Sequence, residues 1–174
     1  MKRIKNLAAL ALFSAVLLTS CGDTEPLDPA VATGNTEDEI IGRYRLTAFN
    51  TDVPTDLNND GNTSTNQMSE TSCYNNMFLN LNEDNTFTAD SRGVDISVTE
   101  TLVCFTDPVI TGTWVYANGQ LLLTYTESGE QFTDTYTVAG DRISIRENAA
   151  TIVGVPMDTP VFLSSGISIV YTKL

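Results

Sequence analysis

The sequence contains no histidine among its 174 residues. A Ser-His-Asp or Cys-His catalytic system and a histidine-ligated metal centre are therefore excluded. Basic side chains are also scarce, because nine Lys and Arg stand against 22 Asp and Glu, and the net charge is −13. A surface with this charge repels nucleic acid and anionic lipid headgroups. We therefore expect no nucleic-acid partner.

Only three cysteines are present, and the first of them, Cys21, follows a leader-like segment. A positively charged N-terminus precedes an apolar stretch, Leu7–Leu18. This stretch is too short to span a bilayer and is typical of a secretory signal. The stretch ends in Leu18-Thr19-Ser20-Cys21, an aliphatic residue, two small residues and a cysteine. That tetrapeptide resembles the lipobox of bacterial lipoproteins.

The lipobox resemblance implies that residues 1–20 are a signal peptide and that Cys21 becomes a lipidated N-terminus. Two or three acyl chains suffice for stable anchoring. We expect a lipid-anchored protein of the cell envelope, at the outer membrane, on its periplasmic or its surface-exposed face. An uncleaved anchor helix and a signal without lipidation are the alternatives.

The other two cysteines, Cys73 and Cys104, lie in the part of the chain that would be exported. Export exposes thiols to an oxidising compartment, so the pair favours a disulfide over two free buried thiols. The bridge would close a loop of about 30 residues and contribute roughly 3–4 kcal/mol in the chain-entropy model.

Residues 21–38 are acidic, contain two prolines and have few apolar side chains. They are typical of a flexible tether. Residues 39–174 are expected to form one domain, and their pattern predicts strands. Asn118-Gly119 lies between two apolar runs and is a strong hairpin signal. Similar pairs of runs flank Asp84-Asn85 and residues 139–141.

No segment after the leader has a sustained helical period; at most, Glu37–Ile41 makes one turn. In residues 132–138, aromatic and aliphatic side chains alternate with threonine hydroxyls, although Asp134 falls on the aromatic face. Short strands with tight turns predict an all-β fold, an antiparallel up-and-down meander. Closure into a β-barrel of about eight strands would remove the exposed edges.

Three motifs resemble those of the lipocalin-like domains in lipoproteins of Bacteroidetes type. They are the G-x-W-x-L opening at Gly42–Leu46, with Tyr44 in place of Trp, the hairpin Phe78–Phe87, with Asn85 in place of Gly, and Gly112-Thr113-Trp114-Val115 followed by Gln120–Leu123. The resemblance implies a lipocalin-like barrel over nearly all of residues 39–174. It implies little about function, because such barrels serve many tasks.

One segment has the spacing of a metal site. Residues 56–61 match the first half of a calcium loop, D-x-N-x-D-G, in which oxygen ligands alternate and glycine allows a sharp turn. The twelfth position holds Gln67 rather than glutamate, although Glu70 could reach back and Asp52 could add a carboxylate. The predicted calcium ligands are Asp56, Asn58, Asp60, Asn62 and Glu70. The alternative is a turn-rich polar loop without a metal.

Three function classes follow from these observations. The first is a non-enzymatic lipocalin-like module that binds a small apolar ligand. The second is a structural or protein-interaction module of the cell surface, stabilised by calcium if the loop binds it. The third, an enzyme, is disfavoured because no paired carboxylates, lysine or metal set is placed by spacing. Calcium is the one cofactor considered, and the sequence does not identify a protein partner.

Overall fold

The structure is a computed structural model that describes residues 35–155 and 159–174. Cys21, the leader and residues 21–34 of the tether lie outside the described residues. No helix in the described ranges is long and apolar enough to cross a membrane.

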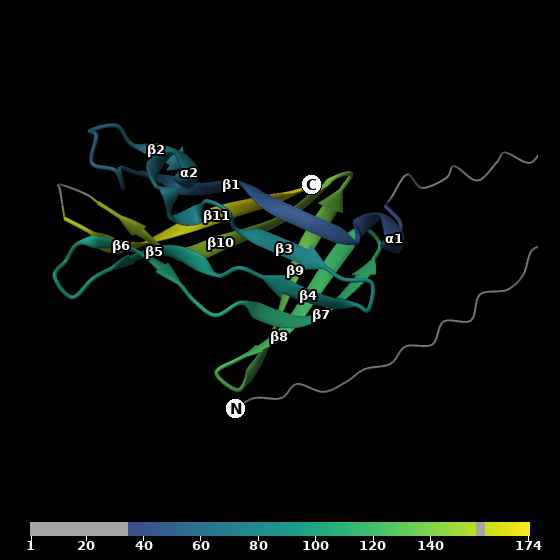
Figure 1. The fold of residues 1–174 in the computed structure, drawn as a ribbon. Helices are drawn as coiled ribbons and strands as arrows, with labels where there is room; N and C mark the ends of the chain where they lie inside the picture. Colours follow the sequence, from purple (N-terminus) through teal and green to yellow (C-terminus); the bar gives the residue numbers. More distant parts are fainter. Residues whose placement is uncertain (1–34, 156–158) are drawn as a thin grey trace, which may run out of the picture. The chain divides into compact units, whose positions relative to one another are not determined.

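Strands dominate the described chain, and helices are limited to single turns (Figure 1). The short helical elements are α1 (Glu37–Ile40), α2 (Gln67–Glu70) and the 3-10 turn η1 (Ser72–Tyr74). The strands are β1 (Gly42–Thr55), β2 (Ser64–Asn66), β3 (Phe78–Leu81), β4 (Thr86–Ala89), β5 (Arg92–Ile96), β6 (Leu102–Thr106), β7 (Ile110–Ala117), β8 (Gln120–Glu127), β9 (Glu130–Ala139), β10 (Arg142–Gly154) and β11 (Val161–Lys173).

Eight of these strands form a closed antiparallel barrel. Their order is β1, β3, β4, β7, β8, β9, β10 and β11, and β11 pairs back onto β1. β2 pairs with β1, and β5 and β6 form a separate two-stranded hairpin. The predicted all-β meander and its closure are confirmed, and the architecture is consistent with a lipocalin-like fold.

The hairpin turns follow from residues that accept a left-handed backbone. Asn118 and Gly119 both have positive φ, 53° and 77°, and they join β7 to β8 in the two-residue turn that the sequence predicts. Asn85 takes φ 60° in the β3–β4 turn, so it fills the place of the expected glycine. Asparagine tolerates this conformation better than most residues, which is why the hairpin forms without glycine.

The hydrophobic core fills one half of the barrel, and Trp114 and Tyr44 are its largest side chains. Trp114 is 1% exposed and its indole N–H donates to the Asn82 carbonyl at 3.1 Å. Tyr44 is equally buried, and its hydroxyl donates to the Ile40 carbonyl at 2.7 Å. Tyr44 thus ties α1 to the barrel, in the position where the related motif has tryptophan. The same core contains Leu46, Leu79, Leu81, Phe87, Leu121, Leu123, Val138, Ile143 and Tyr171.

The sheet separates between β9 and β10, which are paired at one end only. These strands pair only at Ala139–Arg142, Val138–Ile143 and Thr137–Ser144, whereas β10 and β11 stay paired as far as Gly154 and Val161. The far ends of β8 and β9 therefore diverge from those of β10 and β11 (Figure 1). The wall of the barrel is open at this end.

The hairpin β5–β6 is bound covalently to the rest of the domain. A disulfide joins Cys73 of η1 to Cys104 of β6, with the two Cα atoms 5.2 Å apart. This is the bridge expected from the sequence. The hairpin also contacts β10, so it lies beside the outer ends of β10 and β11.

In the described residues, contacts with the barrel are present from Asn35 onward, within the segment assigned to the tether. The Asn35 side chain exchanges hydrogen bonds with the backbone of Gly140. Glu37 accepts from Asn85, and Glu39 accepts from the backbone N–H of Thr36 at the start of α1. The expected single turn at residues 37–41 is therefore present as α1.

Candidate ligand-binding sites

The predicted calcium loop is a tightly hydrogen-bonded turn. The Asp56 carboxylate accepts from the backbone N–H groups of Asp60 at 3.1 Å and Gly61 at 2.8 Å. The Asp60 carboxylate accepts from the backbone and side chain of Asn62 and from Asn58. These hydrogen bonds hold the pKa of Asp60 below its usual value. The structure therefore brings Asp56, Asn58, Asp60 and Asn62 together.

The remaining expected ligand, Glu70, is buried next to this turn. The residue is 7% exposed, and its carboxylate accepts from the backbone N–H of Leu57 at 3.1 Å. Gln67 faces Thr51 and Thr55 of β1, and Asp52 pairs with Arg146. Among the described residues, no three His, Cys, Asp or Glu side chains gather closely enough to hold a metal. Calcium binding stays a prediction. It requires the side-chain oxygens of Asn58 and Asn62 as ligands in addition to the carboxylates.

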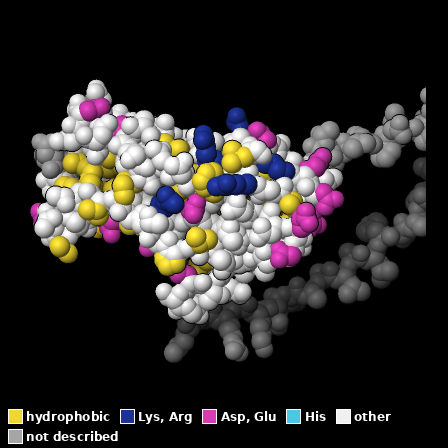
Figure 2. All heavy atoms as spheres, in the orientation of Figure 1, with side chains coloured by type: hydrophobic (Ala, Val, Ile, Leu, Met, Phe, Trp, Pro, Cys, Tyr) yellow, Lys and Arg dark blue, Asp and Glu magenta, His cyan; other side chains and the backbone are white. Residues whose placement is uncertain are grey.

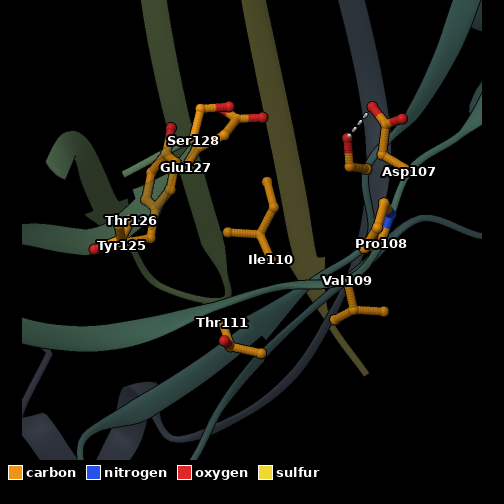
Figure 3. Close-up of a pocket in the computed structure, with 10 residues that line it drawn as sticks. Asp107, Pro108, Val109, Ile110, Thr111, Tyr125, Thr126, Glu127 and Ser128 are labelled. Atoms are coloured by element: carbon orange, nitrogen blue, oxygen red, sulfur yellow. Dashed lines mark hydrogen bonds between the residues drawn. The ribbon is translucent and has the colours of Figure 1, made fainter. Parts of the chain in front are cut away.

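A cavity of about 400 Å³ lies at the open end of the barrel (Figure 3). Glu127 and Ser128 stand on one side of it and Asp107 and Pro108 on the other, while Ile110 points between them. Its lining contains two carboxylates and no basic side chain. We call it the barrel mouth.

Tyr125 connects the mouth to a carboxylate inside the barrel. Its hydroxyl donates to Asp134 at 3.2 Å, and its ring stacks on Phe132 with the centroids 5.7 Å apart. Burial raises the pKa of Asp134, and burial together with the Asp134 charge raises the pKa of Tyr125 to about 12. The alternation in β9 predicts that Asp134 faces inward, but the hydrogen bond to Tyr125 was not predicted.

A second hollow, of about 210 Å³, lies between the hairpin β5–β6 and the outer ends of β10 and β11. We call it the hairpin groove. It is lined by Phe49, Tyr74, Arg92, Gly93, Val94, Phe105, Thr151, Ile152, Val153 and Phe162. Hydrophobic side chains gather over this end of the domain (Figure 2). Phe162 is 60% exposed there and Phe105 is 36% exposed.

Aromatic rings form the walls of the groove. Phe49 and Tyr74 meet edge to face with centroids 4.7 Å apart. The Phe105 ring lies against Gly93, where an added Cβ would come within 2.7 Å of it. Burial raises the pKa of the Tyr74 hydroxyl to about 12, against a smaller lowering by the backbone of Val94. Tyr74 is therefore neutral at physiological pH and acts as an apolar wall with a polar tip.

The disulfide holds two of these walls in place. Cys73 directly precedes Tyr74, and Cys104 directly precedes Phe105. The bridge therefore fixes the hairpin against η1 at the position where both rings enter the groove. A preformed apolar hollow loses less entropy on binding than one that must assemble around its ligand.

Among the described residues that line the groove, Arg92 alone is charged. Its Nε atom is buried without a hydrogen-bond partner in the described part of the chain. The ion pairs among the described residues, Arg142–Asp141 and Arg146–Asp52, do not involve it. The groove thus combines aromatic walls with one arginine that forms no ion pair among the described residues.

Sequence reasoning did not predict the hairpin groove or Arg92. The only available signal was the disulfide, whose two cysteines are each followed by an aromatic residue. Comparison with known proteins adds no assignment, because no family model, curated protein or solved structure matches this chain.

Proposed function

We propose that this protein is a lipid-anchored, non-enzymatic binding module of the cell envelope that holds a small apolar ligand in the hairpin groove. It would be a lipocalin-like lipoprotein of Bacteroidetes type, anchored by Cys21 at the outer membrane. The observation that carries the proposal is the groove itself, a hollow of about 210 Å³ with partly exposed aromatic walls fixed by a disulfide. Ligand sites typically combine mostly apolar walls with few polar groups.

The ligand is assigned to the groove because the closed half of the barrel is filled by side chains and the barrel mouth is lined by carboxylates. An eight-stranded barrel either holds one small ligand or is filled by its own side chains. Here Trp114, Phe87 and Leu121, all at most 2% exposed, fill the closed half. The barrel mouth has space, but its acidic lining is unfavourable for an apolar molecule.

Catalysis is not part of the proposal. The chain has no histidine, and its only lysine after the leader, Lys173, donates to the Glu39 carbonyl. Without a base poised beside a nucleophile, the aromatic groove is suited to binding alone.

Binding of N-phenyl-1-naphthylamine, a neutral dye that fluoresces in apolar surroundings, tests the proposal. Phe162→Asp places a charge in the groove wall, and Val115→Asp is its matched control, because both side chains are 60% exposed and on strands. We expect the dye to bind the wild type and the control, and to bind Phe162→Asp at least about tenfold more weakly. Equal binding to the two variants, or none to the wild type, overturns the proposal.

The exposed apolar side chains also favour the second function, a protein-interaction module of the cell surface. Val103 is 41% exposed and lies on β6 beside Phe105, so the apolar surface extends beyond the groove. Patches of this kind commonly mark protein contacts. Cross-linking in intact cells discriminates: a fixed protein partner that is lost in Phe162→Asp supports interaction, whereas a small molecule recovered by native mass spectrometry supports ligand binding.

A further inference from the structure

Arg92 forms no ion pair with the described residues of the chain. The chain has 22 acidic residues and nine basic ones, so carboxylate partners are abundant. Even so, in the described ranges no carboxylate forms an ion pair with Arg92, and its Nε donor is buried without an acceptor. A buried donor without a partner is destabilising, and more so when it belongs to a charged group. Arg92 as a whole is only half-buried and lines the groove, so a bound molecule that carries an anionic acceptor would supply the missing charge partner.

The other lining residues of the groove indicate what that molecule is. Phe49, Tyr74, Phe105 and Phe162 present rings, and Val94 and Ile152 present aliphatic surface. Among the described residues, the lining contains no acidic side chain. An anion that enters the groove therefore meets the positive charge of Arg92 beside uncharged walls.

We infer that the ligand of the hairpin groove is a small aryl or alkyl carboxylate, whose apolar part packs against the aromatic walls and whose carboxylate binds Arg92. This inference rests on the proposed function and names its ligand class. The planar guanidinium matches a carboxylate with two parallel N–H donors, and such charged hydrogen bonds are stronger than neutral ones. The volume of about 210 Å³ favours a small ligand of a few rings or a short chain.

Two probes that differ only at the head group test the inference. They are 3-phenylpropanoate and 3-phenylpropan-1-ol, and each is titrated as a competitor of the bound naphthylamine dye. This readout reports on the groove because the dye is displaced from it. We expect the carboxylate to displace the dye from the wild type at a concentration about tenfold lower than the alcohol.

Arg92→Gln removes the charge and keeps a polar side chain of similar length. We expect it to bind the alcohol as the wild type does and to lose the preference for the carboxylate. Arg92→Lys keeps the charge without the paired donors, so it should retain only part of the preference. Arg142→Gln is the control, because Arg142 is highly exposed and lies outside the groove. Circular dichroism and thermal melting check that each variant is folded.

The outcomes separate the inference from the function on which it rests. Equal affinity of the wild type for the two probes, or a carboxylate preference that survives in Arg92→Gln, overturns the carboxylate assignment and leaves an apolar binding module. Failure of both probes and of the dye to bind overturns the proposed function and the inference with it. If Arg92→Gln does not fold, Arg92→Lys and the salt dependence of wild-type binding decide, because only the carboxylate should bind more weakly at high salt.

Discussion

Single residues in this domain have roles that their position in the strand pattern only partly predicts. Asp134 occurs where β9 alternates apolar and hydroxyl side chains, and the pattern correctly places it on the inner face. The pattern does not reveal that Tyr125 of the neighbouring strand donates to it, because that contact depends on register between strands. Arg92 was missed for a similar reason, since its surroundings come from several other elements.

Asp134 is expected to make stability depend on pH. Because burial raises its pKa, the folded protein keeps the proton at pH values where the unfolded chain has lost it. The contribution of this carboxyl to stability is therefore full below the ordinary aspartate pKa and is lost as the pH rises through the raised value. Asp134→Asn removes the titration and keeps an acceptor for Tyr125. We expect the melting temperature of the variant to exceed that of the wild type at about pH 7.

Melting curves from about pH 3 to about pH 7 check this expectation. The advantage of Asp134→Asn should shrink as the pH falls below the ordinary aspartate range. Asp95→Asn, on the exposed side of β5, is the control and should follow the wild type. A constant difference between Asp134→Asn and the wild type across this range would contradict the account.

At the scale of elements, the disulfide does more than close a loop. The hairpin β5–β6 pairs with no other strand, so its position depends on the bridge and on contacts with η1 and β10. Replacing Cys73 and Cys104 together by alanine should lower the free energy of unfolding by about 3–4 kcal/mol in the chain-entropy model. It should also weaken dye binding, because Tyr74 and Phe105 would no longer be held together.

Urea denaturation and dye titration measure the two effects separately. Reduction of the wild type should reproduce both of them, and reduction of the double variant should change neither. Dye binding that survives in the folded double variant would show that the groove does not need the bridge.

The acidic turn before β2 is the element on which the calcium prediction depends. Asp56 and Asp60 already hold the backbone through hydrogen bonds, so the loop has its turn geometry without a metal. Affinity in the range of about 10⁻⁴–10⁻³ M, typical of extracellular modules, would suffice to raise the melting temperature in millimolar calcium. Calorimetry should show binding that is lost in Asp56→Ala/Asp60→Ala and retained in Asp84→Ala. Absence of both heat and thermal stabilisation would rule out this site.

The elements that the sequence predicted well are those defined by local chemistry. Asn118-Gly119 specifies its turn regardless of what surrounds it, and Trp114 behaves as the core residue that its strand implies. The strands β5 and β6 were not predicted, and their separation from the barrel sheet depends on tertiary contacts that the sequence does not show. The groove could not be predicted from the sequence either, because its walls come from six elements that only the fold brings together: β1, η1, β5, β6, β10 and β11.

At the scale of the whole molecule, the net charge and the proposed lipidation have opposite consequences for membrane binding. A chain with a net charge of −13 is repelled by anionic headgroups, so electrostatics cannot hold this domain at a bilayer. The acyl chains on Cys21 would have to supply the attraction alone, and two or three of them are enough. The charge then favours a domain that stays in solution beside the membrane while its groove remains accessible.

Cys21→Ser tests this division of roles. We expect the wild type in the membrane fraction, released by detergent but not by high salt, because acyl chains rather than charges hold it. Cys21→Ser cannot be acylated on sulfur and should leave the membrane fraction, while the purified domain binds the dye with unchanged affinity. Mass spectrometry of the N-terminal peptide should find diacylglycerol on Cys21 of the wild type. Membrane partition of Cys21→Ser equal to that of the wild type would overturn the lipid anchor and indicate an uncleaved leader as the attachment.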